Sequence, residues 1–408
     1  MNPILIKGYG ISIYVDKRKL IIDNKLNLKQ SNTGLNRLNE LNNPVKYEFY
    51  PHQIPYDSII IDGYYGSVSF EAMRWLSKHD VSISLLNWNG NLLSVTQPQE
   101  TLNADLKIKQ YENYLNSESR LYIASQIVRQ KVKSSLSLIN GLLKFYDINL
   151  ETINREMQRV DYDNINSLMT YEGRIASAYW TELSKIFNQL APDFNFQSRK
   201  NLSYSWNMNA SDPVNALLNY GYAILESMVR KNINTVGLDV SIGYLHEIAP
   251  SKHPLVYDLQ ELFRYVIDYS VIELLETKLK KTDFMTTENY HIRLRPNIAK
   301  LLIDKIKNNF NKRYEFKNKQ HTLENIMFEN IRELSRYISG KTKSLEFKIP
   351  DIAISRNDTI DIKNRIMSID PEKRKALKIN KSTLWYQQKK IKEGKEIKVY
   401  RKMRVRIE

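Results

Sequence analysis

Residues 81–95 read VSISLLNWNGNLLSV, and this stretch lies at the end of a predicted β-rich region, just before a predicted helical region. Two short apolar runs flank Asn89–Gly90, a strong signal for a tight β-hairpin. Upstream, alternating apolar runs over residues 4–24 are followed by a short helical pattern at 69–80. We therefore expect residues 1–100 to form a small β-rich domain that carries one helix.

Beyond the hairpin the chain changes to helical periodicity. Apolar side chains recur every three or four residues, as in Ser119–Phe145 and Asn215–Asn232. The predicted fold class is α+β, mostly α. After the β-rich domain we expect an α-helical domain, a helical extension and a C-terminal part, at residues 101–278, 279–345 and 346–408.

The pattern of the C-terminal part favours a helix-turn-helix. The alternative is a solvated basic tail. Pro371 can open a first short helix, and Ser382 can cap a second helix through its hydroxyl. Four apolar side chains would supply a small core: Leu377, Ile379, Leu384 and Trp385. The second helix would lie in a DNA major groove. Its expected DNA contacts are Lys381, Ser382, Thr383, Tyr386, Gln387, Lys389 and Lys390.

The composition of the chain limits the partners and the metal ligands that can be expected. The chain has 408 residues, a formal net charge of +16 and no cysteine. The positive charge favours a polyanionic partner, first of all nucleic acid, although a generally basic surface is the alternative. Without thiolates, a metal site has to use His, Asp and Glu, and carboxylates suit Mg²⁺ or Mn²⁺. No run is apolar enough for a membrane span and no signal peptide is recognisable, so we expect a cytoplasmic protein without a membrane partner.

Glu172 is the first candidate for a metal ligand. It lies in residues 167–187, SLMTYEGRIASAYWTELSKIF, on the same helical face as Ile175, Ala176 and Tyr179. A carboxylate that points into packing is costly unless it is paired or binds a cation. The alternative is that Glu172 stands at a helix N-terminus and complements the helix dipole.

A second group of candidates follows in residues 245–276. Asp258 and Glu261 are neighbours at a spacing of three on one helix, within an acidic stripe that continues to Asp268. Two carboxylates so close repel each other unless a cation lies between them, but a solvated acidic face is the alternative. His246 is expected at or near a loop beside them. One Glu, one His and a second Glu can together hold a divalent ion.

A polar stripe also recurs on one predicted helix, at Asn215, Asn219, Glu226 and Arg230, and it could line a cleft or face solvent. Other chemistries find no support. The sequence contains no GxxxxGK[ST] phosphate loop, no GxSxG nucleophile motif and no HExxH zinc motif.

Four ordered stretches over roughly residues 1–275 resemble the CRISPR-associated integrases, metal-dependent DNA nuclease-integrases. They are residues 59–90, IIIDGYYGSVSFEAMRWLSKHDVSISLLNWNG; 171–180, YEGRIASAYW; 212–247, DPVNALLNYGYAILESMVRKNINTVGLDVSIGYLHE; and 255–264, LVYDLQELFR. The resemblance implies an N-terminal β-sandwich, which would dimerise and touch DNA, and an α-helical catalytic domain.

The resemblance also implies roles for the candidate residues. Glu172, His246 and Glu261 would be catalytic and hold Mg²⁺ or Mn²⁺, with Asp258 as an outer or auxiliary ligand. The polar stripe would lie near the active-site cleft. The expected partners are double-stranded DNA ends and target DNA, bound by a homodimer or a larger homo-oligomer.

The long C-terminal part departs from typical members and is similar to that of casposases, the integrases of casposon mobile elements. This similarity favours insertion of a mobile element, in which a 3′-OH DNA end is joined to a target phosphodiester by transesterification. Two alternatives remain: a CRISPR adaptation integrase that works with a small partner protein, and a DNA-binding homologue without catalysis.

Overall fold

A computed structural model of the chain describes most of the sequence. The described residues are 2–8, 10–24, 46–63, 65–87, 90–96, 103–199, 210–250, 252–286 and 291–354, followed by 366, 367, 369, 374 and 379–392. The chain divides into two compact units, residues 1–352 and residues 353–408. None of the helices described is long and apolar enough to cross a membrane.

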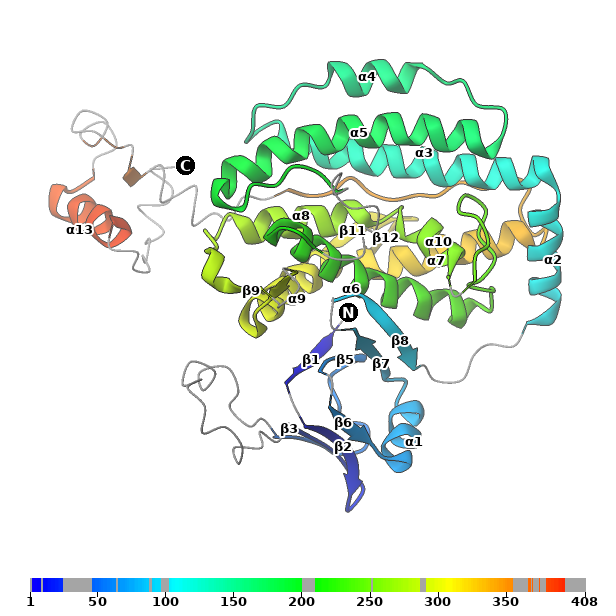
Figure 1. Cartoon of the computed structure of the whole chain (residues 1–408), viewed down its shortest axis with the longest axis horizontal. Coiled ribbons are helices and arrows are strands. Elements are labelled where there is room, and N and C mark those ends of the chain that lie inside the picture. Colours follow the sequence, from blue (N-terminus) through cyan, green and yellow to red (C-terminus); the bar gives the residue numbers. More distant parts are fainter. Residues whose placement is uncertain are drawn as a thin grey trace. The chain divides into compact units, whose positions relative to one another are not determined.

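The N-terminal region contains two four-stranded sheets, which confirms the β-rich structure predicted there (Figure 1). Its strands are β1 (Pro3–Lys7), β2 (Ile11–Asp16), β3 (Lys19–Asn24), β4 (Lys46–Phe49), β5 (Ser58–Asp62), β6 (Gly66–Val68), β7 (Ser82–Leu86) and β8 (Leu92–Thr96). One sheet has the order β1-β5-β7-β8 and the other β4-β3-β2-β6. The predicted hairpin joins antiparallel β7 and β8, and Gly90 in its turn has φ +83°, which glycine adopts without strain.

Both sheets pack on one hydrophobic core. Ile13 of β2, Ile59 of β5 and Trp75 of helix α1 (Phe70–Lys78) are among its buried side chains. Ser69 begins α1, because its side chain accepts a hydrogen bond from the backbone N–H of Ala72. The core therefore joins residues from both sheets and from the one predicted helix.

The larger region is helical, as the 3.6-residue periodicity predicted. Its helices are α2 (Ala104–Leu115), α3 (Ser117–Leu142), α4 (Glu151–Gln158), α5 (Ile165–Leu190), α6 (Pro213–Val236), α7 (Pro254–Gln260) and α8 (Arg264–Leu275). Helices α3 and α5 run side by side, and both pack on α8, which in turn packs on α6 (Figure 1). Gly221 of α6 allows this last contact, since a Cβ there would lie 2.4 Å from Ile267 of α8.

The described part of residues 279–352 contains two α-helices, in the region predicted as a helical extension, but the sequence pattern located only one of them. The located helix is α10 (Leu323–Ile338) and the other is α9 (Pro296–Asn311); the region also contains two short hairpins, β9 (Phe284–Thr286) with β10 (Ile292–Leu294), and β11 (Arg313–Phe316) with β12 (Lys319–Thr322). After α10 an extended segment alternates buried Leu345, Phe347 and Ile349 with exposed residues. It bonds to α3, because the backbone N–H groups of Leu345 and Ile352 donate to Tyr122 and Ser137.

The C-terminal unit contains α13 (Lys381–Lys392). Asn380, and not Ser382, caps this helix, because the Asn380 Oδ1 accepts bonds from both the backbone N–H and the hydroxyl of Ser382. The Ser382 cap was therefore wrong, since Asn is an equally good cap and stands two residues earlier. Ile379 and Leu384 are buried as predicted, but Trp385 is 60% exposed and does not join them. The first helix expected from Pro371, with Leu377, lies outside the described residues, so the helix-turn-helix stays a prediction.

Candidate metal centre

Helix α5 carries Glu172 well inside its length. The helix begins at Ile165 behind a capping box, in which the Asn164 side chain and Ser167 exchange bonds with each other's backbone N–H groups. Glu172 therefore lies about two turns into the helix, too far from the N-terminus to serve its dipole, and that alternative is wrong. Its Oε1 lies 2.6 Å from the Nζ of Lys131 on α3.

Glu261 follows the last residue of α7 and is nearly buried, with 7% of its side chain exposed. Its Oε2 lies 2.6 Å from the same Lys131 Nζ, and its Oε1 lies 2.5 Å from Nη1 of Arg264. Burial alone would raise the pKa of Glu261, but the charges of Arg264 and Lys131 outweigh it and lower the pKa to about 2. Glu261 is therefore a buried carboxylate that stays ionised.

His246 is fixed by Asp258. The fully buried Asp258 carboxylate accepts bonds from the backbone N–H groups of Tyr244, Leu245 and His246, and Oδ1 lies 2.7 Å from the Nδ1 of the His246 ring. Gly243 makes room for this arrangement, because a Cβ there would lie 2.9 Å from Oδ2 of Asp258. Nδ1 facing a carboxylate leaves Nε2 of the ring for a ligand.

This arrangement assigns Asp258 an orienting contact with His246. Its two oxygens already face four N–H positions, which leaves little capacity for a metal bond. Burial lowers the pKa of His246, but the hydrogen bond and charge of Asp258 outweigh it, so that the pKa lies above its ordinary value. Asp258 is thus suited to supporting a ligand from behind it.

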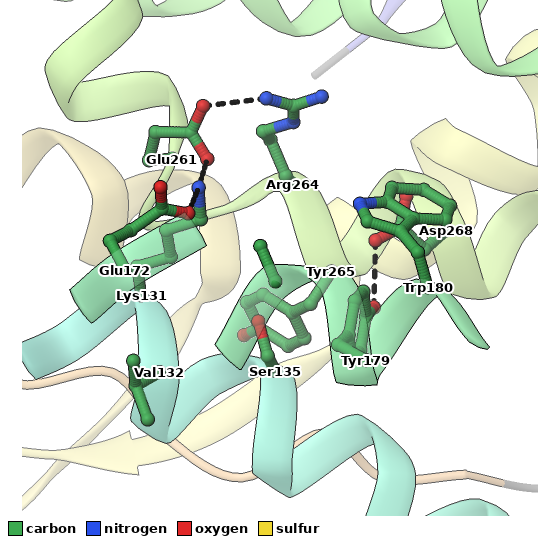
Figure 2. A pocket seen from close by; sticks show the side chains of 11 residues that line it. Lys131, Val132, Ser135, Glu172, Tyr179, Trp180, Glu261, Arg264, Tyr265 and Asp268 are labelled. Atoms are coloured by element: carbon green, nitrogen blue, oxygen red, sulfur yellow. Dashed lines mark hydrogen bonds and ion pairs between the residues drawn. The ribbon is translucent and has the colours of Figure 1, made fainter. Parts of the chain in front are cut away.

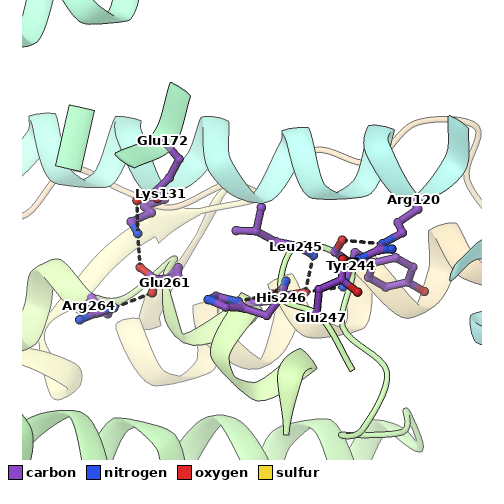
Figure 3. Close-up of polar contacts among 10 residues, drawn as sticks. Arg120, Lys131, Glu172, Tyr244, Leu245, His246, Glu247, Glu261 and Arg264 are labelled. Atoms are coloured by element: carbon purple, nitrogen blue, oxygen red, sulfur yellow. Dashed lines mark hydrogen bonds and ion pairs between the residues drawn. The ribbon is translucent and has the colours of Figure 1, made fainter. Parts of the chain in front are cut away.

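The three predicted ligands come from distant parts of the chain and lie in one neighbourhood. Figure 3 shows Glu172, Lys131, Glu261 and Arg264 in a continuous chain of ion pairs, with the His246 ring pointing toward Glu261. Among the residues that the structure describes, no three His, Asp or Glu side chains are already gathered in a metal-holding cluster. The place between the two carboxylates is taken by the Lys131 ammonium.

These donors nevertheless fit a hard divalent cation. Two carboxylate oxygens that share one ammonium are already arranged around a single positive charge, and an imidazole nitrogen stands beside them. Carboxylate oxygens are the ligands that Mg²⁺ and Mn²⁺ prefer, and an imidazole held by a carboxylate is a common addition. Glu172, Glu261 and His246 Nε2 are therefore the groups that would hold the ion.

A cavity of about 40 Å³ lies beside the two glutamates (Figure 2). Asp268 lies in its wall and accepts bonds from the hydroxyls of Tyr179, at 2.7 Å, and Tyr222, at 2.5 Å. Burial raises the pKa of Asp268, although the two tyrosine hydroxyls and Arg264 lower it in part. The remaining lining residues are Lys131, Val132, Ser135, Glu172, Ala176, Trp180, Glu261, Arg264 and Tyr265.

The predicted polar stripe on α6 separates into two pairs. Asn215 and Asn219 both accept bonds from the guanidinium of Arg199, which also stacks over Trp180 in the cavity wall. Glu226 and Arg230 lie further along the helix, and Glu226 is near Tyr257, whose ring packs edge-on against His246. Neither pair is thus in direct contact with the candidate ligands. Arg199 connects the asparagine pair to the cavity wall, and Tyr257 lies between Glu226 and His246.

Three cations of the site were not among the predicted residues. Lys131 follows Ile127 and Val128 by four and three positions on α3, so a lysine on a buried helical face was the signal that could have revealed it. Arg264 follows Glu261 at the ion-pair spacing of three. Arg199 gave no such local signal, since its partners stand on α5 and α6.

The residues predicted to contact DNA on α13 are mostly exposed. Lys389 lies 5.1 Å from the centre of the Trp385 ring and Lys390 lies 4.9 Å from that of Tyr386. Lys381, Ser382 and Thr383 are exposed at the start of the helix. Gln387 is the exception: it is 5% exposed and turns into the unit, so it is not placed to contact DNA.

Comparison with known proteins now identifies the family. Residues 5–308 match the family of the CRISPR-associated protein Cas1. The chain belongs to the Cas1 family. A Cas1 endonuclease of Francisella tularensis subsp. novicida is 27% identical over 84% of this chain and 97% of its own length.

Solved structures share this fold. A casposase bound to integration product is 35% identical, with a TM-score of 0.77 over 90% of this chain and 99% of that chain. A Cas1 protein of Thermotoga maritima is 19% identical and shares the fold, with a TM-score of 0.66 over 85% of this chain and 99% of that one. The family match ends within α9, so α10 and the C-terminal unit lie beyond it.

Proposed function

We propose that this Cas1-family chain is a metal-dependent DNA integrase of the casposase type, which joins a 3′-OH DNA end to a target phosphodiester. One observation carries the proposal: carboxylates from α5 and from the end of α7 share one cation beside a histidine that a buried aspartate orients. The likeness to a casposase bound to integration product, over most of both chains, supports the mobile-element role.

The residues have distinct tasks in this mechanism. Glu172, Glu261 and His246 Nε2 would hold Mg²⁺ or Mn²⁺, which when bound would neutralise the phosphodiester and acidify the attacking hydroxyl. Arg264 fixes the second oxygen of Glu261, and Asp258 fixes the tautomer of His246. Surface lysines and arginines would bind phosphates without reading sequence.

Transesterification needs no covalent enzyme intermediate, so no nucleophilic side chain is required. The attacking oxygen of the 3′-OH loses its proton to solvent and forms a bond to phosphorus. The bond from phosphorus to the target strand's own 3′ oxygen breaks, and that oxygen takes up a proton as it leaves. Two ends joined to two strands require two such sites, and we therefore propose that a homodimer or larger homo-oligomer acts on double-stranded ends and target DNA. We also propose that α13 contacts DNA through Lys381, Ser382, Thr383, Tyr386, Lys389 and Lys390.

The test is strand joining of a labelled duplex end into plasmid DNA in the presence of Mn²⁺. Glu172→Gln, His246→Ala and Glu261→Gln should each abolish joining while keeping DNA affinity. Glu247→Gln is a matched control, because this exposed glutamate is ion-paired with Arg120 one residue from His246. A donor with a 3′-dideoxy end should not be joined. Full joining by Glu261→Gln contradicts the proposal.

The CRISPR-associated alternative rests on the Francisella relative, which matches nearly throughout its length. The same assay separates the two roles. An integrase of a mobile element should join its own terminal sequences without a second protein. A spacer-acquisition integrase should instead require a small partner and a repeat-containing target. A non-catalytic homologue would bind DNA and show no metal-dependent nicking of supercoiled plasmid.

A further inference from the structure

Lys131 occupies the centre of the candidate metal site. Its Nζ lies 2.6 Å from Oε1 of Glu172 and 2.6 Å from Oε2 of Glu261, and only 19% of its side chain is exposed. Figure 3 shows it as the single link between the two glutamates. The side chain comes from α3, a helix that supplies none of the proposed ligands.

The ammonium and a divalent ion compete for the same oxygen atoms. Mg²⁺ binds carboxylate oxygens at about 2.0–2.1 Å, so an ion held by both glutamates would stand where the ammonium now stands. Two positive ions cannot share that position, because their repulsion at contact distance is large when the surroundings are largely dry. Binding of the ion therefore requires Lys131 to leave.

The charge balance of the site also indicates that Lys131 is the cation that leaves when the divalent ion binds. Glu172 and Glu261 carry two negative charges, and Lys131 and Arg264 carry two positive charges, so the group is neutral before any metal binds. Arg264 keeps the other oxygen of Glu261 and can remain. Lysine has a flexible four-carbon stem and can swing away, whereas the planar guanidinium of Arg264 is held between Glu261 and the face of the Tyr222 ring.

We propose that Lys131 is a built-in competitor of the divalent ion, and that a bound DNA phosphate relieves the competition by accepting the displaced ammonium. This inference rests on the proposed function, because it takes Glu172 and Glu261 as the metal ligands. It makes metal binding and DNA binding mutually reinforcing, since each removes a cost of the other. A site without DNA would then load metal poorly, and phosphodiester cleavage away from a bound end would be suppressed.

The experiment measures Mn²⁺ affinity by calorimetry, with and without a duplex whose 3′ ends are dideoxy so that no joining occurs. Lys131→Met keeps the stem and removes the charge; Lys133→Gln, an exposed lysine of the same helix, is the control. We expect Lys131→Met to bind Mn²⁺ at least about tenfold more tightly than the wild type without DNA. DNA should tighten Mn²⁺ binding in the wild type and in Lys133→Gln, but scarcely in Lys131→Met.

Thermal unfolding guards against a merely structural effect. Without the ammonium, Glu172 and Glu261 repel each other, so metal-free Lys131→Met should melt at a lower temperature than the wild type, and Mn²⁺ should raise its melting temperature by more. Equal or weaker Mn²⁺ binding by Lys131→Met overturns the competitor role while the metal site itself stands. Absence of Mn²⁺ binding in the wild type both without and with the DNA duplex overturns this role and the proposed function.

Discussion

Glu261 and Asp268 are two buried carboxylates seven residues apart, and the structure gives them opposite surroundings. Two cations, Arg264 and Lys131, lower the pKa of Glu261 to about 2 against the opposing effect of burial. Around Asp268 burial raises the pKa, and the hydroxyls of Tyr179 and Tyr222 supply the nearest hydrogen bonds. Glu261, whose partners are cations, can thus exchange one of them for a metal ion. Asp268, whose partners are tyrosine hydroxyls, is held in place as a hydrogen-bond acceptor.

Paired substitutions at these two positions test the comparison most directly. Glu261→Gln should weaken Mn²⁺ binding by about a hundredfold or more, because a ligand is lost and not only its support. Asp268→Asn should change Mn²⁺ affinity by less than about threefold while lowering stability, since Asn still accepts one of the two tyrosine bonds. Calorimetric titration of both variants checks this. Comparable losses of affinity would show that the two carboxylates are not divided in this way.

Asp258 offers a second, smaller effect, because in the proposed site it would act on the metal through His246. Asp258→Asn should weaken Mn²⁺ binding at pH 8 by about 10–100-fold. It should also lower the pKa of His246, because the carboxylate that raises it against burial is gone. A neutral imidazole is needed for binding, so the fall in Mn²⁺ affinity on acidification should begin at a lower pH in the variant. Affinity measured from pH 5.5 to 8.5 shows the shift; an unchanged midpoint would separate Asp258 from the tuning of His246.

Glu226 sharpens the comparison with a third kind of setting, a partly buried carboxylate near a single arginine. Burial raises its pKa from the ordinary 4.5 to about 7, although Arg230 lowers it in part. The folded protein therefore holds a proton that the unfolded chain releases, and stability falls as pH rises from about 4.5 to about 7. Glu226→Gln should be more stable than the wild type by about 1–3 kcal/mol at pH 8, and about equal to it near pH 4.5.

Urea unfolding at the two pH values measures this difference. Glu247→Gln, an exposed glutamate with its own arginine partner, is the control and should show no such pH dependence. A Glu226→Gln variant that gains nothing at pH 8 would mean that this carboxylate is as well compensated as Glu261.

The candidate residues could be found in the sequence, but their division of labour could not. Glu172 on an apolar helical face and the acidic stripe from Asp258 to Asp268 were visible as periodic patterns. Glu261 and Asp268 belong to the same stripe, and Arg264 stands three residues after the first and four before the second, so the local pattern does not tell which carboxylate it pairs with. Their difference arises from the pairing of Arg264 with Glu261 and from distant residues: Lys131 comes from α3, and the two tyrosines come from α5 and α6.

Prediction of the fold from the sequence was likewise limited for short elements. Long amphipathic helices such as α3 and α6 define their own period and were predicted, whereas β9 to β12 have three or four residues each, too few to display one. Helix α9 lies in the region predicted as a helical extension, but its bounds were not located, although Pro296 stands at its first turn, a favourable start signal. At α13 two good capping residues stand close together, and the pattern favoured the wrong one.

The extended segment after α10 has a practical consequence for shortening this protein. Asn330 of α10 bonds both to the backbone N–H and to the backbone C=O of Lys348, and Ile352 bonds to α3, the helix of Lys131. A chain that ends at residue 343 would lack the buried side chains of Leu345, Phe347 and Ile349 and would expose to water the surface that they cover. A deletion meant to remove only the C-terminal unit, proposed here to contact DNA, has to begin after Ile352. Otherwise a loss of joining would report the loss of packing on α3 and not the loss of a DNA contact.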